Sequence, residues 1–270
     1  MAQENSTPRL VGMSFYEHFD ELRTRIVRCL WLFMAGFALC YTQADLILGV
    51  LRKPLFDVLE ASQRKLYFTS LFENFMVHLK IAGVASLFLF SPFYFYQLWG
   101  FIAPGLYQRE RKLVVPFVAA ASLFFMAGGA FAYFVLFPVG FKFFVTYGAP
   151  SDVPLLTIDS YYTTCLKLLL LFGLAFELPV MITLLGYLGL VDSTTLKAQR
   201  KTAIIGITIA AALFAPPDAI SMLILGVPLV LMYEGSIWVV HWLGVKRATR
   251  ADVAAAEAAK VDPLSGKSGP

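Results

Sequence analysis

The sequence predicts an all-α integral membrane protein with six transmembrane helices, on the basis of its composition, its apolar runs and its charge placement. Hydrophobic residues make up 59% of the 270 residues and charged residues 15%. Soluble domains are about half apolar and about one quarter charged. The apolar runs are about 20 residues long, enough for a helix to cross a ~30 Å hydrocarbon core. They are continuous, whereas a transmembrane barrel would show segments of about 10 residues with alternating polarity.

The N-terminal segment is predicted to form an amphipathic helix that lies at the membrane surface and leads into the first span. Ser14 and Glu17 have the spacing of a capping box, so the helix is expected to begin near Phe15. Apolar and charged side chains then fall on different sides of the helix, as in interfacial helices. The first span is predicted over residues 26 to about 44.

Three further spans are predicted in the middle of the chain, each a continuous apolar run: residues 75–99, 113–137 and 161–190. Polar segments separate the runs and are predicted to lie outside the membrane: residues 46–72, residues 142–159 and the short turn 192–200. Pro138 is expected to close the third span, because proline lacks the amide hydrogen that a helix interior uses.

The fifth and sixth helices are predicted to be short. Residues 203–215 provide only about 13 apolar residues, fewer than a comfortable span requires. Pro216 and Pro217 are expected to end that helix, since two consecutive prolines remove two amide donors. Asp218 is expected to cap the sixth helix, which is predicted over residues 219–242.

The lysine and arginine residues predict the orientation of the chain in the membrane. With both termini in the cytoplasm, fifteen of these residues in the polar segments fall on the cytoplasmic side and five on the outer side. Positive charge concentrates on the cytoplasmic side of membrane proteins, so both termini are predicted to be cytoplasmic. This asymmetry also explains the net charge of +4, and no nucleic-acid partner is expected. Residues 1–245 are expected to form one transmembrane domain, and residues 246–270 a mobile cytoplasmic tail.

The sequence contains no motif that indicates catalysis or a bound cofactor. It has no phosphate-binding glycine-rich loop, no zinc-ligand spacing and no haem or thiol motif. Cys29, Cys40 and Cys165 lie in or beside apolar runs and are not spaced as metal ligands. We therefore expect a protein that is not an enzyme and that requires no cofactor or metal.

Glu177 is an acidic residue predicted to lie near the middle of the fourth span. An ionised side chain there costs at least ~2.5 kcal/mol, so the acid is expected to be protonated, paired or exposed to water. Pro179 leaves the carbonyl of Ala175 without its helical donor close by. Glu177 is either a functional intramembrane group or a neutral acid that hydrogen-bonds a neighbouring helix. Glu234 lies nearer the cytoplasmic end, where a structural role fits equally well.

Two carboxylates on the predicted cytoplasmic face, Glu21 and Glu110, are candidate acceptors for guanidinium groups. Glu110 lies within a basic cluster, residues 109–112, and Glu21 lies four residues before Arg25, with which it can pair. A carboxylate accepts the planar fork of arginine through two hydrogen bonds, which lysine cannot offer. The alternative is that each acid forms a surface salt bridge, worth ~0–1 kcal/mol, within its own cluster.

Four segments of the chain are informative as a set: HFDELRTR (18–25), SPFYFYQLWGFIAPGLYQRERK (91–112), FELPV (176–180) and APPD (215–218). In sequence and order they resemble TatC, the six-span receptor subunit of the twin-arginine protein translocase, and the resemblance covers nearly the whole chain. It implies a protein of the prokaryotic cytoplasmic membrane that binds twin-arginine signal peptides. It also implies export of folded proteins with the proton motive force.

The resemblance implies roles for individual residues. Glu21 and Arg23 correspond to the family's N-terminal signal-peptide-binding residues, and Phe101 and Glu110 to those of its first cytoplasmic loop. Glu177 corresponds to the mid-membrane acid of the fourth span. The positions assigned to the outer loop and to partner contact are Pro54, Pro216, Pro217 and Asp218.

The resemblance further implies two small single-span partners, TatA and TatB, and a homo-oligomer within a larger complex. Members of the family often have polar side chains near the double proline, where partners dock, but this chain has Ala212, Ala215 and Met222 there. Two other function classes are considered. A proton-coupled small-solute transporter with Glu177 as carrier would require a second polar ligand within the membrane. A structural assembly scaffold fits the architecture but leaves Glu110 unexplained.

Overall fold

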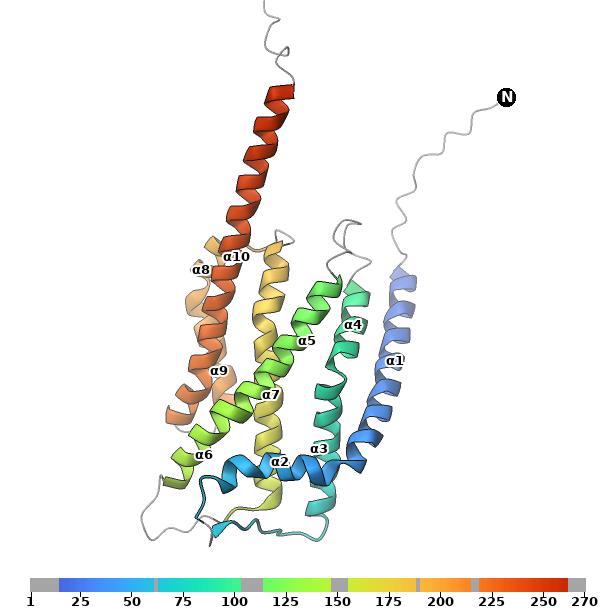
Figure 1. Cartoon of the computed structure of the whole chain (residues 1–270), viewed down its shortest axis with the longest axis vertical. Coiled ribbons are helices and arrows are strands. Elements are labelled where there is room, and N and C mark those ends of the chain that lie inside the picture. The colour runs from blue at the N-terminus through green and yellow to red at the C-terminus, as the bar shows by residue number, and fades with distance from the viewer. Residues whose placement is uncertain are drawn as a thin grey trace, which may run out of the picture.

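The computed structural model describes residues 15–60, 63–102, 114–146, 155–187, 190–214 and 219–261, and most of these residues are helical. Long helices run side by side along one direction, and one helix, α2, lies across one end of the bundle (Figure 1). The start of α1 and the far end of α10 both lie at the other end (Figure 1). The elements in chain order are α1 (Phe15–Thr42), α2 (Ala44–Phe56), α3 (Glu73–Leu89), α4 (Ser91–Ile102), α5 (Val114–Phe131), the π-helical turn η4 (Ala132–Leu136), α6 (Phe137–Thr146), α7 (Ile158–Tyr187), α8 (Ser193–Ala198), α9 (Arg200–Phe214) and α10 (Ala219–Val261).

Within the described ranges, four helical stretches are long and apolar enough to cross a membrane, and the bent pair α3 and α4 provides a fifth candidate. The four are found in α1, in the continuous run from α5 to α6, in α7 and in α10. The predicted all-helical membrane architecture is therefore confirmed. The prediction of a short fifth helix is also confirmed, because the 15 residues of α9 give a length of about 22 Å against a ~30 Å hydrocarbon core.

The two ends of the chain differ from prediction in their helix boundaries. α1 is continuous from Phe15 to Thr42, so the predicted surface helix is the first part of the first span and not a separate element. The sixth helix is not short, since α10 contains 43 residues and ends at Val261. Its alanine-rich end strongly favours helix, and this explains why the segment predicted as a tail from Lys246 continues as helix. The mobility of that segment stays a prediction.

The interior elements also differ from prediction. The predicted second span divides into α3 and α4 with a bend of 61°, where Pro92 in the first turn of α4 has no amide to extend the α3 ladder. Pro138 does not end the third span, because it lies in the first turn of α6, directly after η4, where a missing donor is tolerated. The predicted turn at residues 192–200 contains the short helix α8.

α2 lies inside the segment that was predicted as an extramembrane loop. Its buried residues include Leu48, Leu51 and Leu55, which follow helical spacing and pack in the main core. The core continues through α3, η4 and α7, with Phe137 and Phe172 among its fully buried side chains. α2 is therefore part of the packed bundle, across the end opposite the start of α1 (Figure 1).

Candidate functional site

Glu21 forms an ion pair with Arg25 on the first turns of α1, as their spacing predicted. Nη2 and Nε of Arg25 lie 2.6 Å and 3.0 Å from the same carboxylate oxygen, Oε1. Both side chains are about 20% exposed, so the pair is partly shielded from solvent. The second oxygen of Glu21, Oε2, is buried and has no hydrogen-bond partner among the described residues.

Arg25 also connects α1 to α4. Its Nη1 lies 3.3 Å from Oε1 and 3.4 Å from the backbone oxygen of Gln97, and both contacts are long for hydrogen bonds. Gly100 leaves the space for this guanidinium, because a Cβ added there would overlap with Nη1 and lie 2.8 Å from Cζ. Phe101 is half-buried and lies one turn after Gln97, on the same face of α4. The structure therefore brings the Glu21 segment and the Phe101 segment together.

Other predicted binding residues are placed less closely or lie outside the described ranges. Arg23 is exposed and, two residues from Glu21, lies on another side of α1. Glu110 is not among the described residues, but α4 ends at Ile102 and α5 begins at Val114, both at the α1-start end of the bundle (Figure 1). The predicted contact residues Pro216, Pro217 and Asp218 also lie outside the described ranges.

Glu177 lies in the middle part of α7, two residues before the buried Pro179. Its Oε1 atom is buried without a hydrogen-bond partner in the part of the chain that the structure describes. The preceding residue, Phe176, packs its ring against that of Phe131, with the centroids 5.6 Å apart. A buried acceptor without a donor is costly, and it can accept a hydrogen bond from a bound group.

Glu234 has a structural partner. Nη2 of Arg200 lies 2.6 Å from its Oε2, and the hydroxyl of the neighbouring Tyr233 donates to the Leu196 carbonyl at 2.9 Å. These contacts tie α8 and the start of α9 to α10. The ion pair supports the structural interpretation of Glu234, and Lys167 is exposed. Neither residue supplies the second buried ligand that the solute-transporter alternative requires.

Pro54 is buried in the last turn of α2. Because proline has no amide hydrogen, the carbonyl of Val50, four residues earlier, lacks its usual helical donor. The hydroxyl of Tyr133 donates to that carbonyl oxygen at 2.9 Å, and the hydroxyl of Tyr161 donates to the carbonyl oxygen of Leu51 at 2.6 Å. Tyrosines from η4 and α7 therefore hold the turn of α2 that contains Pro54.

Glu73 is a polar anchor at the same end of the bundle that the sequence interpretation missed. Its carboxylate, 8% exposed, accepts from the backbone amides of Thr69 at 2.6 Å, Ser70 at 3.2 Å and Asp159 at 2.7 Å. It thereby joins the loop before α3 to the first turn of α7. The S-x-x-E spacing of Ser70 and Glu73 is that of a capping box and could have revealed it. Lys80 pairs with Asp159 at 2.5 Å, so a second contact joins α3 to the start of α7.

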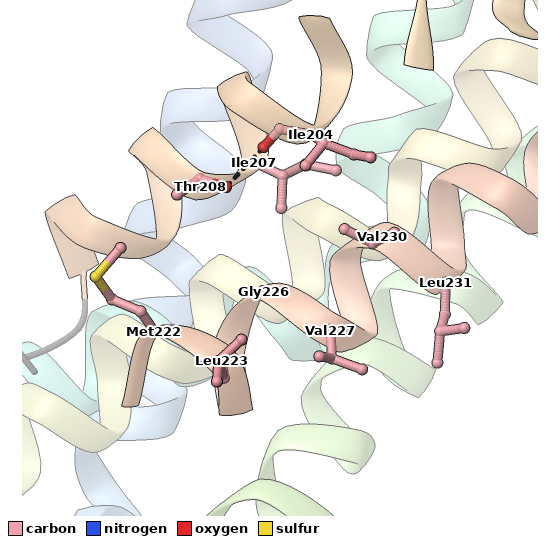
Figure 2. Close-up of a pocket in the computed structure, with 9 residues that line it drawn as sticks. All are labelled: Ile204, Ile207, Thr208, Met222, Leu223, Gly226, Val227, Val230 and Leu231. Atoms are coloured by element: carbon pink, nitrogen blue, oxygen red, sulfur yellow. Dashed lines mark hydrogen bonds between the residues drawn. The ribbon is translucent and has the colours of Figure 1, made fainter. Parts of the chain in front are cut away.

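A groove of about 500 Å³ lies between α9 and α10 (Figure 2). Its surface is almost entirely apolar, since the hydroxyl of Thr208 donates within α9 to the Ile204 carbonyl at 2.8 Å. Met222, one of the residues noted near the double proline, lies on its α10 side (Figure 2). The lining residues are Ile204, Ile207, Thr208, Met222, Leu223, Gly226, Val227, Val230 and Leu231.

The described residues contain no group of three His, Cys, Asp or Glu side chains that could hold a metal ion. Cys40 and Cys165 are buried, Cys29 is partly buried, and all three are free thiols.

Comparisons with known proteins give consistent similarities. The family model for the Sec-independent protein translocase protein (TatC) matches residues 17–228. A Sec-independent protein translocase protein TatC from Magnetococcus marinus is 38% identical over 244 residues, which cover 90% of this chain and 89% of that protein. Its counterpart from Desulforapulum autotrophicum is 36% identical over 241 residues, with 89% of each chain covered. A crystal structure of a twin arginine translocase receptor, TatC, in DDM has a TM-score of 0.75 and 31% identity, and the match covers 82% of this chain and 98% of that one.

Proposed function

The chain belongs to the TatC family and is a receptor subunit of the twin-arginine protein translocase, and from this premise we propose which residues receive the signal peptide. Glu21 and Glu110 accept the guanidinium groups of the paired arginines, while Arg23 and Phe101 contribute to the same surface. The observation that carries the proposal is the shielded Glu21 carboxylate, which lies beside α4 and retains one unpaired oxygen. A charge-assisted bidentate contact there favours arginine over lysine.

The orientation of the chain is part of this proposal. Six spans with both termini in the cytoplasm place the Glu21 segment and the connection between α4 and α5 on the cytoplasmic face of a prokaryotic inner membrane. The common location of the α1 start and the α10 end supports this arrangement (Figure 1). The distribution of lysine and arginine supports it as well.

Membership of the family implies a Tat translocase complex, and we propose TatA-like and TatB-like single-span proteins as the partners. The groove between α9 and α10 (Figure 2) suits an apolar helix, and in sequence these two helices are joined by the segment that contains Pro216, Pro217 and Asp218. Several copies of the chain act together in the complex, which uses the proton motive force to export folded cargo. Pro54 is buried, so its contribution at the outer face is to fix the end of α2 and not to contact a partner directly.

Glu177 has a separate role in this proposal. Its unpaired oxygen is buried beside the middle part of α7, and it accepts a hydrogen bond from a polar group of the signal peptide or of a partner helix. A functional role explains why the chain retains a costly buried acceptor at this depth. Unchanged peptide crosslinking and unchanged export after Glu177→Ala would instead make the acid structural.

Peptide binding to the purified full-length chain tests the proposed receptor. Glu21→Gln and Glu110→Gln should each weaken binding of an Arg-Arg signal peptide by about tenfold or more, the worth of a hydrogen bond to a charged group. They should weaken a matched Lys-Lys peptide less. Glu60→Gln is the control, because Glu60 is exposed at the other end of the bundle. Equal losses for both peptides would contradict the bidentate contact, and an unmodified chain that does not prefer Arg-Arg would contradict the receptor assignment.

A further inference from the structure

Arg25 already occupies the carboxylate that the proposed function assigns to a signal-peptide arginine. Its Nε and Nη2 both donate to Oε1 of Glu21, at 3.0 Å and 2.6 Å. The other oxygen, Oε2, is enclosed by protein atoms. A guanidinium that arrives with a peptide therefore meets a carboxylate with one oxygen engaged and the other covered.

We propose that Arg25 is an internal competitor for Glu21 and that this competition lowers the affinity of the site for every cationic peptide side chain, whereas the geometry of the carboxylate sets its preference for arginine over lysine. The inference rests on the proposed receptor function. To bind Glu21, a peptide side chain must replace the two N–H donors that Arg25 supplies. Arginine presents an equivalent planar pair of donors, whereas lysine presents a compact, strongly hydrated charge without that fork. An exchange with arginine conserves the contacts of Glu21, and an exchange with lysine leaves one of them unmade.

Residues of α4 provide acceptors and space for Arg25 when it leaves Glu21. The backbone oxygen and Oε1 of Gln97 lie 3.4 Å and 3.3 Å from Nη1 of Arg25, so Arg25 retains acceptors when it leaves Glu21. Gly100 provides the space, since a side chain there would overlap with the guanidinium. Arg25 therefore acts through Glu21 as a positioning residue, and it lowers the affinity for the peptide without touching the peptide.

Gly100→Ala tests the inference because it displaces the Arg25 side chain while both members of the ion pair remain in the sequence. The clash is with the end of a flexible side chain, so the α4 backbone does not need to move. With the full chain in nanodiscs, we expect the affinity for an Arg-Arg signal peptide to rise by about twofold to fivefold, the size of a partly exposed ion pair. The affinity for the matched Lys-Lys peptide should rise by the same factor, because either peptide must displace Arg25, so the preference for arginine is unchanged.

Gly83→Ala is the matched control, since its Cβ would meet only the Cζ of Phe33 at an ordinary 3.8 Å, and both affinities should remain unchanged. Arg25→Ala should raise both affinities as Gly100→Ala does, and the double variant should show no further effect. Unchanged or lower affinities in both single variants would overturn the inference, and lower affinities would make Arg25 a structural part of the site. The proposed function fails separately, if the unmodified chain does not prefer the Arg-Arg peptide.

Discussion

At the end of the bundle where α2 lies, the described buried polar groups have partners, whereas at the opposite end and midway along α7 two carboxylate oxygens have none. Tyr161 donates to the Leu51 carbonyl at 2.6 Å, and Glu73 accepts from three backbone amides. By contrast, Oε2 of Glu21 and Oε1 of Glu177 are enclosed without a donor among the described residues. The two regions satisfy their polar groups to different degrees within one fold.

This difference separates two regions of the molecule. We call the region with paired polar groups, which contains Pro54, Glu73, Tyr133 and Tyr161, the frame. The unpaired carboxylates of Glu21 and Glu177 form the receptive region. An unpaired buried acceptor costs about 1–3 kcal/mol, so such groups are expected where a functional contact offsets the cost. The paired region fixes α2 and the starts of α3 and α7 against one another. The unpaired carboxylate oxygens belong to the two glutamates for which we propose ligand contacts, and Oγ of Ser91, the hydroxyl of Tyr94 and Nε of Arg200 are further buried polar atoms without a partner among the described residues. Substitutions in the frame should therefore lower stability, and substitutions at the unpaired carboxylates should change function first.

Glu73→Ala should have the largest effect on stability. Removal of the carboxylate leaves the amides of Thr69, Ser70 and Asp159 without their acceptor and releases the loop before α3 from α7. We expect the thermal unfolding temperature of the purified chain in detergent to fall by about 5–10 °C. Glu60→Ala, at an exposed position at the same end, should have almost no effect. Similar small shifts for the two variants would show that Glu73 does not stabilise this end of the bundle.

The next largest effect concerns Pro54 and Tyr133. Tyr133→Phe removes the donor to the Val50 carbonyl, and we expect a loss of about 1 kcal/mol in unfolding free energy. In a Pro54→Ala background the new amide at residue 54 can bond that carbonyl, so the same substitution should cost less by about 0.5 kcal/mol or more. A double-mutant cycle measured by thermal unfolding checks this coupling. Additive effects would show that Tyr133 does not compensate for the proline.

The frame was the part of the fold least accessible from sequence. Arg52, Lys53 and Pro54 favour a loop when only local sequence is considered, and this is why α2 was missed. The helix is held by Tyr133 and Tyr161, which are 83 and 110 residues away from the carbonyls that they contact. Hydrogen bonds over such separations leave no local pattern. Apolar runs, in contrast, predict helices well because every backbone group in lipid must be paired within its own segment.

In the candidate site, too, local contacts could be predicted from the sequence and long-range contacts could not. The pairing of Glu21 with Arg25 follows from helical periodicity, and it was predicted correctly. The contact of Arg25 with Gln97 spans 72 residues and depends on how α1 packs against α4. The role of Gly100 depends on the same packing. Sequence alone therefore identified the acid but not the competitor that the structure places on it.

Glu177→Leu tests the receptive side of the comparison. Leucine has a similar size and removes an acceptor that lacks a donor, so the unfolding free energy should rise by about 1 kcal/mol while export of a folded cargo falls. Glu234→Leu is the matched control with the opposite expected sign of stability, because it breaks the 2.6 Å pair with Arg200. A loss of stability in both variants would show that Glu177 is also part of the frame.

The smallest expected effect is that of Gln97→Leu. This variant tests whether a contact near Glu21 affects peptide affinity, whereas contacts in the frame affect stability. In the frame, removing an acceptor lowers stability. At Gln97, removal of the side-chain oxygen takes from Arg25 an acceptor 3.3 Å away, so the guanidinium depends more strongly on Glu21. Arg-Arg peptide binding should therefore weaken by about twofold, the worth of a weak contact, with little change in the unfolding temperature. Tighter binding would mean that Gln97 holds Arg25 on Glu21, and then α4 would stabilise the competitor instead of receiving it.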